Sequence, residues 1–236
     1  MPDKQTAIIT GASGGIGAGL VERFLEAGYN VVATSRHASQ KLTASSRLVP
    51  VDGDIANQQT AKSAVEAAIS NFGSIDVLVN NAGIFLARPF IDFSLDEFNA
   101  LVSTNLLGFF LITQLTVREM LKRKSGCVIS ISAALADRPI AGENGSISMM
   151  TKGGLNAATQ NLAVEYAKAG IRFNTVAPGV VDTQMHRNGP NDSTSQPPMK
   201  KVTVKDIADA VLYLAEAGHV NGEILHVDRD APARRW

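Results

Sequence analysis

"TGASGGIG", residues 10–17, follows the apolar run "TAIIT" (6–10) and opens a helical pattern that extends to residue 28. Its glycines at positions 11, 15 and 17 let the backbone turn sharply and approach an anion closely. The start of a helix also offers free N–H groups and the positive end of a dipole. Gly17 permits close packing of the helix on the strand. The spacing is G-x-x-x-G-x-G, not the commoner G-x-G-x-x-G, and a flexible turn is the alternative. Because strand precedes and helix follows, we interpret it as a pyrophosphate cradle.

The alternation of apolar run and helical pattern continues along the chain. Short apolar or β-branched runs occupy residues 6–10, 30–34, 47–51, 75–80, 126–132, 171–177 and 223–227. Helical patterns lie between most of them, at residues 15–28, 57–72, 96–124, 149–169 and 204–217. Runs that are apolar on both faces are typical of a parallel sheet covered by helices on each side. The pattern therefore predicts one α/β domain over residues 1–236, a Rossmann-type doubly wound sheet of about seven strands.

One segment has no apolar period. Residues 185–200, "MHRNGPNDSTSQPPMK", are rich in Pro, Asn and Ser. A loop of this length in a compact domain is usually a lid, a binding loop or a disordered segment. We predict a flexible substrate or lid loop that becomes ordered over the bound cofactor.

Composition limits the class of protein. Of the 236 residues 45% are apolar and 19% charged, and 22 Lys and Arg balance 22 Asp and Glu. No global field favours nucleic acid or an anionic membrane as a partner. Cys127 is the only cysteine, so no internal disulfide forms, and we expect it to pack as a small hydrophobe. The apolar stretch 101–117 carries Ser, Thr, Asn and Gln and is expected to be a buried helix. A soluble, cytoplasmic protein is predicted, and we assign no metal site.

The residues at the end of the second apolar run (30–34) indicate whether the nucleotide is NAD(H) or NADP(H). An acidic residue there would accept hydrogen bonds from the ribose of NAD. Here no carboxylate occurs between Glu26 and Asp52, and Ser35 and Arg36 stand at the end of the run. A guanidinium fork and a hydroxyl match a phosphate, so NADP(H) is predicted in preference to NAD(H). The alternative is that Arg36 is an ordinary surface arginine.

These residues, with motifs downstream, resemble the short-chain dehydrogenase/reductase family over nearly the whole chain. The further motifs are "DGDI" (52–55), "NNAG" (80–83), "STNLLG" (103–108) and "PGVVDT" (178–183). The resemblance implies a nicotinamide dinucleotide as cofactor and a small-molecule substrate. It also implies cofactor contacts from Gly11, Ser13, Gly15, Ile16, Gly17, Asp54, Ile55, Asn81, Ala82, Gly83, Lys152, Pro178, Gly179, Val181 and Thr183.

The same resemblance implies catalysis by an asparagine, a serine, a tyrosine and a lysine four residues after the tyrosine. Asn105 and Lys152 match the asparagine and the lysine, but the serine position falls on Ala133 and the tyrosine position on Ser148. The three tyrosines are followed four residues later by Ala33, Gly170 and Ala217, so the chain has no tyrosine–lysine pair at this spacing. We therefore take Asn105, Lys152 and Ser148 as the candidate catalytic residues.

A serine hydroxyl does not ionise in the range of a phenol beside an ammonium group. Loss of a general acid costs about 10²–10⁴ in rate. Ser132, next to the empty serine position, is an alternative for the polarising serine, and the proton could come from Ser148, Glu143, His186 or water. Two functions remain. One is a weak or specialised NADP(H)-dependent oxidoreductase acting on a carbonyl, hydroxyl or quinone compound. The other is a non-catalytic NADP(H)-binding regulator or partner subunit. The resemblance further implies a homodimer or homotetramer through helices 96–124 and 149–169.

Overall fold

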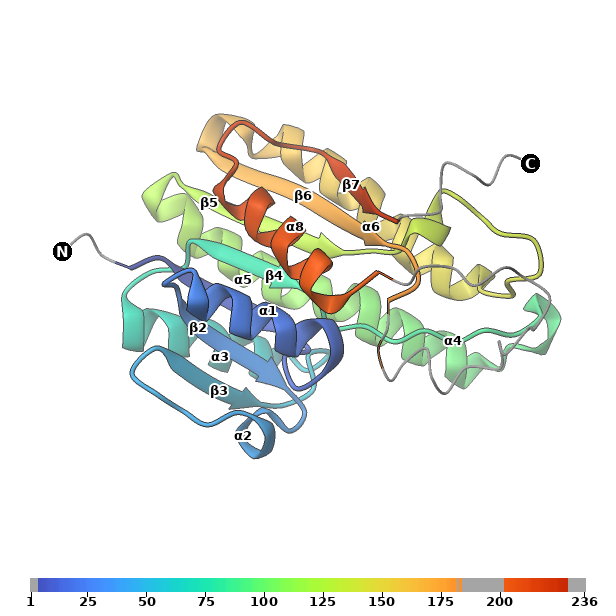
Figure 1. Ribbon diagram of the computed structural model, residues 1–236, viewed down its shortest axis with the longest axis horizontal. Coiled ribbons are helices and arrows are strands. Elements are labelled where there is room, and N and C mark those ends of the chain that lie inside the picture. Colours follow the sequence, from blue (N-terminus) through green and yellow to red (C-terminus); the bar gives the residue numbers. More distant parts are fainter. Residues whose placement is uncertain (1–3, 182, 184–201, 229–236) are drawn as a thin grey trace.

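Seven parallel strands form one sheet in the order β3-β2-β1-β4-β5-β6-β7 (Figure 1). The computed structural model describes residues 4–181, 183 and 202–228, and the predicted loop 185–200 lies outside them. The strands are β1 Thr6–Thr10, β2 Asn30–Ser35, β3 Leu48–Asp52, β4 Val77–Asn80, β5 Gly126–Ile131, β6 Ile171–Pro178 and β7 Ile224–Val227. Each of the seven predicted runs is a strand, and the doubly wound α/β prediction is confirmed.

β1 is an interior strand of this sheet, next to the central strand β4, and is buried along its whole length. Its Ile8 pairs in register with Val32 of β2 on one side and with Leu78 of β4 on the other. The chain proceeds outward from β1 through β2 to β3 and then returns to β4 on the opposite side. The carboxyl ends of β1 and β4 therefore flank the point where the strand order reverses. Ligands of open α/β sheets bind at such a point.

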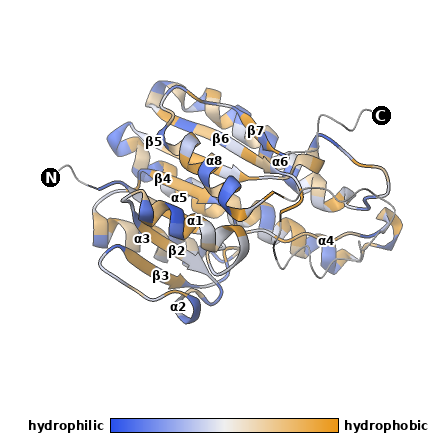
Figure 2. Ribbon diagram, in the orientation of Figure 1, coloured by the Kyte–Doolittle hydropathy of each residue, from blue (hydrophilic) through white to orange (hydrophobic). Residues whose placement is uncertain are grey.

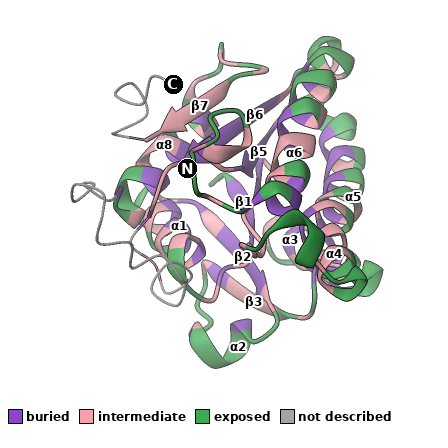
Figure 3. Ribbon diagram, turned by 90° about the vertical axis from the view of Figure 1, so that its right-hand side faces the viewer, coloured by how far each residue is buried: buried purple, intermediate pink, exposed green. Residues whose placement is uncertain are grey.

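Two layers of helices cover the sheet (Figures 1 and 3). Helices α1 (Gly15–Glu26) and α8 (Val204–Glu216) lie together on one face. Helices α3 (Gln58–Phe72), α5 (Gly108–Arg123) and α6 (Ser146–Glu165) cover the other. Figure 2 shows that the strands between these layers are largely apolar. Cys127 of β5 is 2% exposed, as expected of a small hydrophobe, and burial raises the pKa of its thiol to about 11.

The predicted helix 96–124 is continuous but changes its winding. It consists of α4 (Leu95–Val102), a π-helical turn at Ser103–Leu107, and α5. By length and composition, Leu95–Arg123 is apolar enough to cross a membrane, with a mean hydropathy of 1.6. In this fold α5 packs against α3, β4 and β5, but only 39% of the apolar window is buried, so the expected burial holds for one side of the helix. Helix α2 (Ala38–Lys41) and the 3₁₀ turns at Phe90–Asp92 and Ala134–Ala136 have no counterpart in the predicted pattern, whereas the 3₁₀ turn at Ala167–Ala169 forms the end of the predicted helix 149–169.

Candidate functional site

A cavity of about 580 Å³ opens where the carboxyl ends of the strands meet the start of α1. All the residues predicted to contact the cofactor line it, from the glycine turn to the segment after β6. They are Gly11, Ser13, Gly15, Ile16, Gly17, Ser35, Arg36, Asp54, Ile55, Asn81, Ala82, Gly83, Lys152, Pro178, Gly179, Val181 and Thr183. Asn105 and Ser148, the other two predicted catalytic residues, are not part of the lining.

The glycine turn leaves the first helical turn of α1 open to the cavity. Gly11 and Gly15 have φ values of 65° and 53°, a region that favours glycine. A Cβ atom on Gly17 would collide with the carbonyl oxygen of Gly11. No side chain caps the N-terminus of α1, whose N-cap is Gly14. Uncapped N–H groups and the helix dipole in a concave glycine turn suit a pyrophosphate.

Asn81 fixes the shape of this turn. Its Nδ2 donates to the carbonyl oxygens of Thr10 at 2.8 Å and of Gly11 at 3.2 Å. In the opposite direction, the Oγ1 of Thr10 accepts from the N–H groups of Asn81 and Ala82, each at 3.0 Å. The ends of β1 and β4 are thus held together by four hydrogen bonds at the reversal point of the sheet. The side chain of Asn81 thereby positions the cradle.

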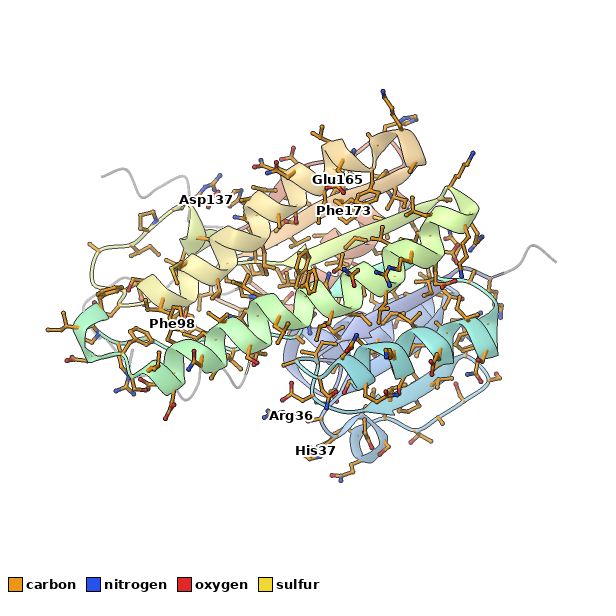
Figure 4. The ribbon with its side chains drawn as sticks, turned by 180° about the vertical axis from the view of Figure 1, so that it is seen from behind. Arg36, His37, Phe98, Asp137, Glu165 and Phe173 are labelled. Carbon is orange, nitrogen blue, oxygen red and sulfur yellow. The ribbon has the colours of Figure 1, made fainter. Side chains whose placement is uncertain are left out.

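The end of β2 forms the nucleotide end of the cavity. The Oγ of Ser35 is buried without a hydrogen-bond partner among the described residues, and Arg36 is exposed beside it. Figure 4 shows Arg36 and His37 next to each other at this end of the sheet. His37 also lines the cavity and was missed from the sequence, where its only signal is its place directly after Arg36. The site thus presents a buried hydroxyl and two basic side chains to a ligand.

No carboxylate occupies the position of Ser35 and Arg36 at the nucleotide end of the cavity. The carboxylate of Asp52 accepts from the N–H and the hydroxyl of Ser39, and these hydrogen bonds hold its pKa below the usual value. Asp52 is not part of the cavity lining. Asp54 does line it, and its Oδ1 accepts from the N–H of Ala56 at 2.9 Å. A ribose hydroxyl would find no carboxylate at the Ser35–Arg36 position.

Lys152 and Asn105 come together around Gly83. A Cβ atom on Gly83 would lie 3.0 Å from the Nζ of Lys152 and 3.2 Å from the Oδ1 of Asn105. Nζ donates to the carbonyl oxygen of Ile131 at 2.8 Å. Burial lowers the pKa of this ammonium group to about 8. The absence of a side chain at position 83 therefore allows a desolvated cation to lie next to the asparagine.

Asn105 lies in the π-helical turn and is 2% exposed. Its Oδ1 accepts from the N–H of Ile84 at 2.8 Å, and its Nδ2 donates to the carbonyl oxygen of Ile84 at 3.0 Å. Nδ2 also donates to the Oγ1 of Thr151 at 2.9 Å. The asparagine thus joins the segment after β4 to α6. π-helical turns of this kind are frequent at functional sites.

Ser148 does not face the cavity. It is fully buried, and its Oγ donates to the carbonyl oxygen of Leu86 at 2.8 Å while accepting from the N–H of Leu86 at 2.9 Å. Ala133 and Ser132 both line the cavity. The Oγ of Ser132 donates to the backbone carbonyl of Lys152 at 3.3 Å. The Ser148 hydroxyl, expected from the sequence to replace the phenol, is therefore engaged with the backbone of Leu86. The short serine side chain reaches only the segment that follows β4.

Two further side chains, Glu143 and His186, were open as alternative proton donors. Glu143 is half-buried, is not part of the lining and already has a partner, whereas His186 lies outside the described residues. Among the ionisable side chains proposed from the sequence that the structure describes, Lys152 lies nearest the Gly83 position.

The far end of the cavity has apolar walls that were not predicted. Half-buried side chains from the segments after β4 and β5 and from α6 form them: Phe85, Leu135, Ile140 and Met149. Arg138 lines the same end. Sequence reasoning missed the three residues of the segment after β5 because that segment has no periodic pattern.

The comparisons with known proteins agree with this architecture. Residues 11–229 match a family model described as Enoyl-(Acyl carrier protein) reductase. A 3-oxoacyl-[acyl-carrier-protein] reductase FabG of Salmonella typhimurium is 32% identical over 237 residues, which cover 96% of this chain and 96% of the relative. An uncharacterized oxidoreductase of Staphylococcus epidermidis is 29% identical over 225 residues, covering 92% of this chain and 94% of the relative.

Solved structures give the same result. A 3-ketoacyl-(acyl-carrier-protein) reductase from Brucella melitensis complexed with NADH has a TM-score of 0.88 and 29% identity, with 95% of this chain and 96% of that chain covered. ElxO with NADP bound has a TM-score of 0.87 and 28% identity, with 98% of this chain and 100% of that chain covered. On the family model, the relatives and the seven-stranded fold, the chain belongs to the short-chain dehydrogenase/reductase family.

Proposed function

We propose that this chain is an NADP(H)-dependent oxidoreductase in which Lys152, in place of a tyrosine, exchanges a proton with a carbonyl or hydroxyl substrate. The observation that carries the proposal is the position of the Lys152 ammonium group beside Gly83, with burial lowering its pKa to about 8. A proton donor works best when its pKa lies near the working pH. An ordinary lysine, with a pKa of 10.5, is a much weaker acid.

Several features support the fit of NADP(H) to the cavity. The collision that any Cβ on Gly17 would cause marks a cradle built for close approach of an anion. The unpaired, buried Oγ of Ser35 and the guanidinium of Arg36 suit the 2′-phosphate. Asp54 and Ile55 are assigned to the adenine, and Pro178, Gly179, Val181 and Thr183 to the nicotinamide. When bound, the cofactor supplies or accepts the hydride.

The chain's own residues move and position the proton. Lys152 gives its proton to the carbonyl oxygen as the carbonyl carbon is reduced, and it regains one from water. Its hydrogen bond to Ile131 directs Nζ, and Asn105 holds the backbone at Ile84 beside it. Ser148 has a structural role through its two hydrogen bonds to Leu86. Because Ala133 offers no hydroxyl to polarise the carbonyl, turnover should fall about 10²–10³-fold short of a complete tetrad.

A second function is favoured by a specific observation. Of the four expected catalytic positions, Asn105 and Ser148 do not line the cavity and Ala133 lines it without a polar group, so Lys152 alone presents a polar group to it. A non-catalytic NADP(H)-binding protein, acting as a regulator or a partner subunit, would have the same site.

NADPH oxidation with a panel of aldehydes, ketones and quinones separates the two functions. The oxidoreductase proposal expects slow, substrate-dependent oxidation that Lys152→Ala abolishes. Binding of NADPH to this variant is measured separately by fluorescence, because Lys152 also lines the cofactor site. Tight NADPH binding with no substrate-dependent oxidation in the wild type would favour the binding protein.

We also propose that two or four copies assemble through α5 and α6, in a protein of the cytoplasm. These helices lie side by side on one face of the molecule (Figure 4). They carry exposed apolar side chains: Leu107 at the start of α5, Phe110, Leu121, Met150 and Val164. Burial of this area stabilises an association. Light scattering on the wild type and on Phe110→Glu tests it, and a monomeric wild type would contradict it.

A further inference from the structure

The cavity has a basic group at each end. Of the described arginines, Arg36 and Arg138 both line the cavity and form no ion pair or side-chain hydrogen bond with a described residue. Arg36 lies at the nucleotide end. Figure 4 shows Asp137, the neighbour of Arg138 in the chain, far from Arg36, across the carboxyl edge of the sheet. A dinucleotide phosphate accounts for Arg36 but leaves Arg138 without an anion.

The turn that carries Arg138 is anchored on both sides. The N–H of Arg138 donates to the carbonyl oxygen of Ala134 at 3.0 Å. Asp137 is bonded to the Nε2 of His226 in β7, at 2.9 and 3.0 Å from its two carboxylate oxygens. The backbone at position 138 is therefore tied to the sheet, and the exposed guanidinium has no hydrogen-bond or ion-pair partner within residues 4–181, 183 and 202–228.

The surroundings of Arg138 define the kind of ligand. Phe85, Leu135, Ile140 and Met149 give this end apolar walls. Of the two described carboxylates that line the cavity, Asp54 accepts from the N–H of Ala56, and Asp228 lies against Gly179 and already has a partner. Specific sites commonly combine an apolar lining with a few polar groups that orient the ligand. A guanidinium offers a planar fork of donors that matches a carboxylate.

We infer that Arg138 binds an anionic group on the substrate, and that the substrate is an apolar carbonyl compound carrying a carboxylate. This inference rests on the proposed oxidoreductase function, because it places the carbonyl of the same molecule beside Lys152. It assigns Arg138 to substrate specificity and not to the chemical step.

Binding can be tested without turnover. Two pairs of ligands, phenylglyoxylate and 3-benzoylpropanoate, each with its methyl ester, are titrated by calorimetry into protein saturated with NADP⁺. The two acids differ in the spacing between carbonyl and carboxylate. We expect one acid at least to bind about 5-fold or more tightly than its ester, with a preference that weakens as salt is raised. Arg138→Gln should reduce the preference to under about 2-fold, and Arg138→Lys should retain part of it.

Arg88→Gln is the matched control. Arg88 is half-exposed, pairs with Glu97 at 2.9 Å and does not line the cavity, so its loss should leave the preference unchanged. Equal binding of acid and ester by the wild type, a preference that survives Arg138→Gln, or no binding of either pair up to about 10 mM would each overturn the inference. If the preference is found but no compound is reduced, the oxidoreductase proposal fails and the anion site stands. If a compound is reduced but acid and ester bind equally, the inference about Arg138 fails and the oxidoreductase proposal stands.

Discussion

The hydroxyl of Ser148 is bonded twice to the backbone of Leu86, as donor at 2.8 Å and as acceptor at 2.9 Å. These two hydrogen bonds tie the first turn of α6 to the segment that follows β4, 62 residues earlier in the chain. A hydroxyl with both functions engaged inside the protein is poorly placed to donate to a substrate. The position that resembles the family's tyrosine therefore has a structural role here.

Ser148→Ala should lower stability and leave catalysis nearly unchanged. The free energy of unfolding is expected to fall by about 1–3 kcal/mol, because the backbone groups of Leu86 lose their partners. Turnover should change by less than about 3-fold. Urea unfolding and NADPH oxidation measure the two effects. Ser146→Ala, at the exposed start of the same helix, is the control and should change stability by less than about 0.5 kcal/mol. If the Ser148→Ala variant is folded but its turnover falls about 100-fold, where less than about 3-fold is expected, Ser148 is the proton donor.

The pH dependence of carbonyl reduction should follow Lys152. Its pKa lies at about 8, and only the protonated amine can donate. The rate of reduction is therefore expected to be constant below this pH and to fall about tenfold per unit above it. Alcohol oxidation should show the opposite trend. Lys152→Arg should remove the transition near pH 8, since a guanidinium keeps its proton, and should reduce turnover strongly. A profile that is flat from about pH 6 to 10 in the wild type contradicts the assignment.

The same amine should make stability depend on pH. Burial lowers the pKa of Lys152 from 10.5 to about 8, so between these values the unfolded chain binds more protons than the native one. The free energy of unfolding contributed by this group therefore rises as pH increases from 8 to 10.5, and the native state carries its full penalty below pH 8. Lys152→Met should stabilise the cofactor-free protein at pH 7 by about 1–3 kcal/mol. The gain should shrink towards pH 10. Urea unfolding of both proteins at the two pH values checks this, and a gain independent of pH would refute it.

The fold was largely predictable because its signals are local. A strand in a sheet covered on both faces needs apolar or β-branched residues on both sides, and runs such as 6–10 and 126–132 have that composition. Each of these runs is a strand in the structure. The glycine turn was predictable for the same reason, because Gly11 and Gly15 have positive φ values and Gly17 faces the carbonyl of Gly11 within the turn.

The details of the catalytic end depend on contacts between distant segments. The bond from Ser148 to Leu86 and the approach of Lys152 to Gly83 join α6 to the segment after β4. The π-helical turn at Ser103–Leu107 is likewise invisible in an apolar pattern that continues through it. Sequence spacing identified the lysine and the empty tyrosine position, but it could not show where the serine hydroxyl points.

Arg36→Gln tests the choice of cofactor. The affinity for NADPH is expected to fall about 10–100-fold, the loss of one or two charge-assisted hydrogen bonds to a phosphate. The affinity for NADH should change by less than about 3-fold, because it lacks that phosphate. Ser35→Ala should weaken NADPH binding less, by about 3–10-fold. Fluorescence titration measures the NADPH and NADH affinities of the wild type and of each variant. Lys41→Gln, in the nearby α2 but outside the cavity lining, controls for a general change of charge. Equal affinities of the wild type for NADPH and NADH would reject the assignment of Arg36.

The cradle itself is tested by two neighbouring glycines that differ in the space around them. A Cβ on Gly17 would collide with the carbonyl of Gly11, whereas a Cβ on Gly14 meets no atom within 4 Å. Gly14 also has an extended backbone that any residue adopts, with φ of −176°. Gly17→Ala should therefore push α1 away from the turn, costing about 1–3 kcal/mol of stability and at least about 100-fold in NADPH affinity.

Gly14→Ala should cost less than about 1 kcal/mol, the difference between glycine and alanine at an N-cap. Its NADPH affinity should remain within about 10-fold of the wild type, because the first-turn N–H groups keep their places. Urea unfolding and fluorescence titration of the two variants give the comparison. If Gly17→Ala binds NADPH as tightly as the wild type, the cofactor's pyrophosphate does not lie on this helix N-terminus, and the placement of the nicotinamide beside Lys152 falls with it.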